Sequence, residues 1–126
     1  MPNQLRDIIE AAPNAMIVVD SMGRIRQVNQ LAERMFGYLE HDVLRQPVEL
    51  LVPPQLRAAH VSNRTDYMRQ PHTRPMAADH DLACMRSDGT EFRAMIALRP
   101  IVVDDITMIA VAIANVSAGE RLTAIE

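Results

Sequence analysis

The sequence predicts an α+β fold, in which five antiparallel strands form one sheet and short helices lie on one of its faces. Strand-like patterns occur near both ends of the chain, two before residue 30 and three after residue 78, whereas helical patterns occupy the middle. The chain of 126 residues suffices for one domain with one core. Strands from both ends must therefore pair with one another to complete a single sheet.

The first predicted element is an amphipathic cap helix within residues 1–14. Its apolar side chains recur at the i, i+3, i+4 and i+7 spacing of one helical stripe. The stripe consists of Leu5, Ile8, Ile9 and Ala12. Pro13 ends the helix, because the residue before a proline avoids helical backbone angles. We expect the stripe either to cap the domain's own sheet or to form a dimer interface with a second copy.

A β-hairpin is predicted next, with strands over residues 15–20 and 24–28 and a turn at Gly23. Asn29 is a suitable N-cap for a following helix, because its side chain can accept from the free amides of the first turn. Gly37 is typical of the residue that ends a helix. The segment between Asn29 and Gly37 is therefore predicted to be helical.

The rest of the chain predicts two more helices and then three strands. The helices are expected over residues 39–44 and from about 54 to 68, since a proline fits the first turn of a helix. The strands are expected over residues 79–86, 91–99 and 106–116. Ser-Asp-Gly-Thr forms the first of the connecting turns and two aspartates the second.

Composition excludes several classes of function. Thirteen basic residues, all arginine, stand against sixteen acidic ones and form no stripe, which argues against nucleic acid as a partner. A single cysteine, Cys84, precludes an internal disulfide and has the apolar neighbours of an inert strand residue. The sequence has neither a signal peptide nor an apolar run of transmembrane length, so we expect a cytoplasmic domain without direct membrane contact.

Several motifs carry a resemblance to a known family. They are Ala-Pro-Asn-Ala-Met-Ile-Val-Val-Asp at 12–20, Gly-Arg-Ile at 23–25 with Val-Asn at 28–29, Ala-Glu-Arg-Met-Phe-Gly-Tyr at 32–38, and Arg-Ser-Asp-Gly-Thr-Glu-Phe at 86–92. In this order they resemble bacterial sensory PAS domains, with a core at residues 15–117. The resemblance implies a signal-transduction module that holds a ligand or cofactor between sheet and helices. It also implies a homodimer that relays its signal to an output domain outside this chain.

The end of the last strand departs from the PAS pattern. The family commonly closes this strand with Asp-Ile-Thr, where this sequence has Asn115, Val116 and Ser117. Asparagine keeps hydrogen-bonding capacity but lacks the charge, so a charged contact that relatives use would be replaced here. Residues 118–126 are predicted to begin a C-terminal connector helix, and the family's relay role is carried over only in part.

One segment is also similar to oxygen-sensing haem PAS domains. Residues 51–60 resemble the stretch that supplies the proximal histidine, which implies His60 as the axial ligand of a b-type haem. Met76 and His80 are the candidates for the distal side, where neither of two family patterns is reproduced. Many PAS domains without known haem carry a similar stretch. A haem-binding gas or redox sensor is therefore an alternative function.

Other chemistries find less support in the sequence. Flavin is disfavoured, because no reactive-cysteine motif follows the first hairpin and Cys84 lies on a predicted strand. A metal site at residues 79–81 is disfavoured, because adjacent strand residues point to opposite faces. An unliganded dimerisation module, or one that binds a small apolar molecule, accounts equally well for the nine methionines. Motifs for nucleophilic, phosphate or zinc catalysis are missing, so the chain is not expected to be an enzyme, although a small enzyme of unfamiliar type is a second alternative.

Overall fold

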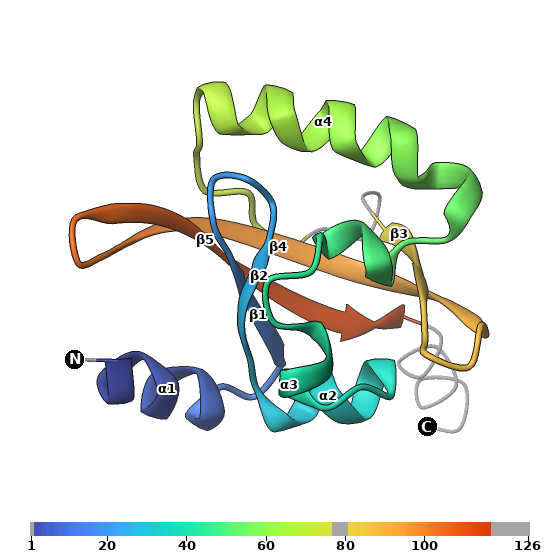
Figure 1. Cartoon of the computed structure of the whole chain (residues 1–126), viewed down its shortest axis with the longest axis horizontal. Helices are drawn as coiled ribbons and strands as arrows, with labels where there is room; N and C mark the ends of the chain where they lie inside the picture. Colours follow the sequence, from blue (N-terminus) through green and yellow to red (C-terminus); the bar gives the residue numbers. More distant parts are fainter. Residues whose placement is uncertain (1, 77–80, 117–126) are drawn as a thin grey trace.

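The computed structural model describes residues 2–76 and 81–116. Its strands are β1 (Ala15–Val19), β2 (Ile25–Val28), β3 (Asp81–Met85), β4 (Glu91–Val103) and β5 (Ile106–Asn115). They form one antiparallel sheet of five strands in the order β2-β1-β5-β4-β3, so the predicted fold class is confirmed (Figure 1). Strand β5 lies at the centre between β1 and β4, which brings the two ends of the chain together.

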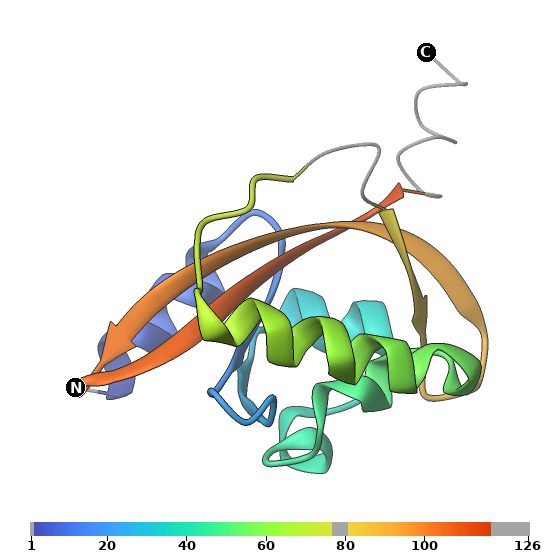
Figure 2. The same cartoon turned by 90° about the horizontal axis from the view of Figure 1, so that it is seen from above.

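The helices lie on both faces of the sheet. They are α1 (Pro2–Ala11), α2 (Gln30–Phe36), α3 (Glu40–Val43) and α4 (Arg57–Arg69), with two 3₁₀ turns, η1 (Val48–Leu51) and η2 (Pro54–Leu56). Figure 2 shows β4 and β5 curving around the side on which α2, α3 and α4 lie. Helix α1 lies across the sheet from α4 (Figure 1). The short helices therefore share one face, and the cap helix has the other.

Side chains on the two faces of the sheet form two apolar clusters. On the concave face, which we call the inner face, Ile17, Val111 and Ile113 pack with Phe36 of α2. On the opposite, outer face, Val18 and Met108 pack with Ile9 of α1. The alternation of Ile17 and Val18 between the clusters follows from the two-residue period of a strand.

The predicted ends of helix α2 are confirmed. The side chain of Asn29 accepts a hydrogen bond from the Ala32 amide at 3.0 Å, and its own backbone is extended, as at an N-cap. Gly37 has a φ of 79°, in the left-handed region that glycine enters without strain. A Cβ at Gly37 would also lie 2.7 Å from the Ser87 hydroxyl oxygen.

The predicted end of the fourth strand at Arg99 is wrong, because β4 continues through Pro100 to Val103. Among the described residues, β3 pairs with β4 as far as Met95 and Arg74 forms a bridge to Leu98, so at Pro100 the described partner of β4 is β5 alone. A proline, which lacks an amide proton, is tolerated on such an edge. The predictions for residues 79–80, for Ser117 and for residues 118–126 concern parts of the chain outside the described residues.

Candidate functional site

A small cavity lies between the sheet and helices α2 and α3. Its volume is about 10 Å³, and its walls include Ile17, Val28, Phe36 and Leu51. Pockets for small molecules usually measure about 300–1,000 Å³. A larger hollow of about 340 Å³ beside Tyr38 opens on the surface of α2 and α3. Between the sheet and helices α2 and α3, the described part of the inner face therefore has only the small cavity of about 10 Å³.

A charged cluster joins α4 to the rest of the domain. Glu49 of η1 is buried, with 5% of its surface exposed. Its Oε2 lies 2.6 Å from Nδ1 of His60 and accepts a hydrogen bond from Nε of Arg64 at 2.9 Å. Its Oε1 accepts a second bond from Arg64 at 3.2 Å. We call Glu49, His60 and Arg64 the clasp.

The clasp keeps Glu49 ionised in spite of its burial. Burial alone would raise the pKa of this carboxyl, because a charge loses its hydration there. The hydrogen bonds and positive charge of Arg64 and the hydrogen bond of His60 outweigh burial, and the pKa lies below its ordinary value. A buried carboxylate satisfied in this way ties the elements that contribute its partners.

Arg64 extends the clasp to the β1–β2 hairpin. Its guanidinium donates a hydrogen bond of 3.1 Å to the carbonyl oxygen of Met22. A Cβ at Gly23 would collide with the same guanidinium, and Gly23 has a φ of 78°. Glycine is therefore needed at this turn both for its backbone angle and to admit Arg64.

His60 does not fit the axial ligand of a haem in this arrangement. Its Nδ1 bonds to a carboxylate, as the second nitrogen of metal-bound histidines usually does. However, Tyr67 and Met68, further along the same helix, pack against the inner cluster together with Ile96 and Leu98. The cavity between the sheet and helices α2 and α3 measures only about 10 Å³, far too little for a haem.

Of the two distal candidates, the structure describes only Met76. Met76 is half-buried in the segment that follows α4. His80 lies outside the described residues, as does Asp79, so the structure describes only one of the residues 79–81, for which the sequence disfavours a metal site. Among the residues that the structure describes, no group of three His, Cys, Asp or Glu side chains could hold a metal ion.

The apolar stripe of α1 is divided between two environments. Ile9 is 2% exposed and packs against Val18 and Met108, with Leu5 beside it. Ile8 is 67% exposed. Part of the stripe therefore caps the domain's own sheet, whereas Ile8 is directed to the surface.

Polar contacts that the sequence did not reveal hold α1 in place. Arg6 donates to Glu40 of α3 at 2.5 Å and to the Val28 carbonyl oxygen at 3.0 Å. The same Glu40 carboxylate accepts from the Val28 amide at 2.8 Å. Asn29 donates to the Ile9 carbonyl oxygen at 2.7 Å. Arg6 has an i, i+4 partner in Glu10 on α1. Its contact with Glu40 joins two elements 34 residues apart, so only the fold brings these two side chains together.

Cys84 lies on β3 in the inner cluster and is buried. Burial raises the pKa of its thiol to about 11, although Arg93 and Arg86 act in the opposite direction. The thiolate is therefore scarce at neutral pH, in agreement with an inert strand residue.

The comparisons with known proteins agree with this architecture. The sequence model of the PAS fold family matches residues 3–102 of this chain. The chain belongs to the PAS family. Over 88 residues the chain is 34% identical to sensor protein FixL of Bradyrhizobium diazoefficiens. The aligned residues make up 70% of this chain and 17% of FixL. The chain thus spans about a sixth of the length of the curated relative it matches.

Solved PAS structures share the fold at lower identity. The PAS domain of an HTR-like protein from Haloarcula marismortui superimposes with a TM-score of 0.72 at 17% identity, covering 90% of each chain. The LOV protein of Rhodobacter sphaeroides gives 0.74 at 17% identity, covering 90% of this chain and 66% of that one. The described helices include none that is long and apolar enough to cross a membrane. The chain is a PAS domain of the sensory kind, a module of signal transduction that is typically not catalytic.

Proposed function

We propose that this PAS domain senses a small apolar molecule or a redox signal on the inner face of its sheet. The change would pass to an output domain outside this chain, in two-component or cyclic-nucleotide signalling. The observation that supports this proposal is the inner face itself, where Met35 and Met68 border an apolar cluster. Methionine adapts its shape to a guest more readily than branched side chains do.

Haem is the alternative cofactor, and its test is direct. Haem added to the purified chain is expected to give no intense Soret band from an axially ligated iron. The physical reason is that Tyr67 and Met68, on the same helix as His60, pack against the inner cluster, and the cavity on that face measures only about 10 Å³. The measurement is an absorption titration of the wild type, of His60→Ala and of His72→Ala, an exposed histidine that serves as the control.

A Soret band that is present in the wild type and in His72→Ala but lost in His60→Ala would establish haem as the cofactor. It would contradict the packing argument. A spectrum without the band leaves the apolar ligand as the proposal that the inner face supports.

We further propose that the domain forms a homodimer through α1. The exposed Ile8 and the exposed Ile106 on the outer side of β5 are apolar surface that α1 leaves uncovered. Ile8→Glu is expected to convert a dimer, with twice the mass of one chain, into a monomer, because it places a charge in the contact. Light scattering after size-exclusion chromatography measures the mass.

Leu56→Glu is the matched control, since Leu56 is 42% exposed on the opposite side of the sheet. It should leave the mass unchanged. Ile9→Glu is unsuitable, because Ile9 is 2% exposed and a charge there would disrupt the domain itself. A wild type that is monomeric, or a variant Ile8→Glu that stays dimeric, would refute the proposed interface.

A further inference from the structure

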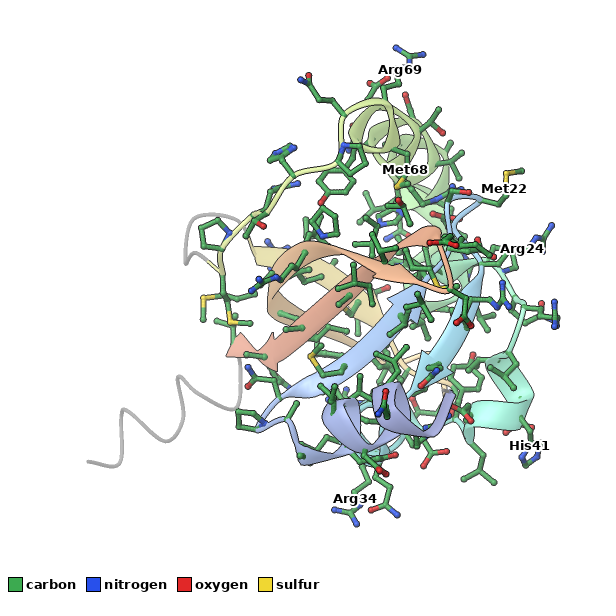
Figure 3. The ribbon with its side chains drawn as sticks, turned by 90° about the vertical axis from the view of Figure 1, so that its left-hand side faces the viewer. Met22, Arg24, Arg34, His41, Met68 and Arg69 are labelled. Atoms are coloured by element: carbon green, nitrogen blue, oxygen red, sulfur yellow. The ribbon has the colours of Figure 1, made fainter. Side chains whose placement is uncertain are left out.

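Helix α4 is attached to the domain differently from the other helices. It has 13 residues, of which none is buried, whereas α2 buries Ala32 and Phe36 in half that length. Its apolar contacts with the inner cluster come from Tyr67 and Met68 near its C-terminal end. Figure 3 shows Met68 directed from α4 toward the body of the molecule and Arg69 directed away from it. The apolar packing that usually fixes a helix is therefore small here.

The clasp replaces this packing at the N-terminal half of α4. Both side chains that contact the Glu49 carboxylate, His60 and Arg64, come from α4, one helical turn apart on one side. The carboxylate of Glu49 belongs to η1, and the Met22 carbonyl oxygen belongs to the hairpin. The four hydrogen bonds from His60 and Arg64 to Glu49 and Met22 would break together if the helix moved away.

The segments that flank α4 could accommodate such a movement. Pro53 and the 3₁₀ turn η2 precede the helix, so the chain changes direction there. After the helix, Arg74 exchanges two backbone hydrogen bonds with Leu98 of β4, at 2.8 and 2.9 Å. This pair of hydrogen bonds attaches the chain after α4 to the sheet at Arg74. Helix α4 therefore lies between η2 and Arg74 and can move between these two attachments.

We infer that α4 is a lid over the inner face of the sheet, and that the clasp is its latch. Release of the latch lets α4 move away while the sheet, α2 and α3 stay folded. The movement uncovers Ile96 and Leu98 on the inner face of β4. The entry of a small apolar molecule by this route rests on the proposed function. The opening of α4 itself does not depend on that function.

Thiol labelling tests the lid. Met68→Cys in a Cys84→Ala background places one cysteine under α4, so the labelling rate reports how often the helix opens. Glu49→Gln, which keeps the shape of the latch but removes its charge, is expected to raise that rate at least about tenfold. Arg69→Gln is the matched control, because Arg69 is 77% exposed on the same helix, and it should change the rate less than about twofold.

The stability of each variant to urea, followed by circular dichroism, separates lid opening from unfolding of the whole domain. The inference holds if the labelling rate rises by a larger factor than the measured decrease in the free energy of global unfolding predicts. It is overturned if Glu49→Gln labels at the reference rate, or if the acceleration equals the loss of global stability. Arg64→Gln is subject to the same criterion if Glu49→Gln does not fold. None of these readouts requires a ligand or an output domain, so a failed lid and a failed sensory function remain distinguishable.

Discussion

Replacing Asn29 with alanine is expected to destabilise the domain by about 3–5 kcal/mol, since each buried polar group left unpaired costs about 1–3 kcal/mol. Asn29 is 1% exposed. Its Oδ1 accepts from the Met16 and Ala32 amides at 2.9 and 3.0 Å, and its Nδ2 donates to the Ile9 and Asn14 carbonyl oxygens at 2.7 and 3.1 Å. Urea unfolding measures the free energy.

Asn63→Ala is the matched control, because Asn63 is exposed on α4. It should cost less than about 0.5 kcal/mol beyond helix propensity. Asn29→Asp keeps both accepted bonds but turns a buried carboxylate oxygen toward the Ile9 and Asn14 carbonyl oxygens, so its cost at neutral pH is expected to be at least as large as that of alanine. A cost for Asn29→Ala no larger than that for Asn63→Ala would show that this residue does not join α1, β1 and α2.

Replacing Glu49 with alanine is expected to cost about 2–4 kcal/mol at pH 7, because it leaves Arg64 without its carboxylate in a partly buried position. The side chain of Arg64 is 19% exposed and that of His60 is 30% exposed, so hydration compensates in part. The double variant Glu49→Ala/Arg64→Ala should cost less than the sum of the two single variants. Strict additivity in urea unfolding would contradict the clasp.

The cost of Glu49→Ala should depend on pH. The side chains that face Glu49 are His60 and Arg64, both on α4. Burial raises the pKa of Glu49, but the contacts with Arg64 and His60 outweigh burial and hold this pKa below its ordinary value in the folded state. The stabilisation is therefore fully present above the ordinary pKa of glutamate and is lost as the pH falls through the lower folded value. The difference between wild type and variant should shrink below about pH 4. A difference that stays constant from neutral pH to pH 3 would argue against an ionised, hydrogen-bonded Glu49.

The order of elements could be predicted because each carries its own local pattern. Asn29 and Gly37 mark the ends of α2, and the Ser-Asp-Gly-Thr turn separates β3 from β4 as expected. The predicted end of β4 failed at Pro100, because a proline is compatible with an edge and the sequence does not show which part of a strand lacks a neighbour.

The candidate site was less accessible to sequence reasoning. His60 attracted attention through its resemblance to haem PAS domains, but its partner Glu49 lies eleven residues earlier in a different element. A lone glutamate within the apolar run from Val48 to Val52 was the available signal, since an acid there must be paired if it is buried. Arg64 gave no signal of its own, because arginines are spread along the whole chain.

The central claim is that the inner face of the sheet receives the sensed molecule, and methionine-methyl NMR tests it most directly. Met35 and Met68 report on the inner cluster, whereas Met16 and Met108 report on the outer one. Titration with indole and with decanoate, two small apolar probes, is expected to shift the inner pair in a saturable manner and to leave Met108 unchanged. Saturable shifts confined to Met16 and Met108, or no saturable shift of the inner pair with either probe, would contradict the claim.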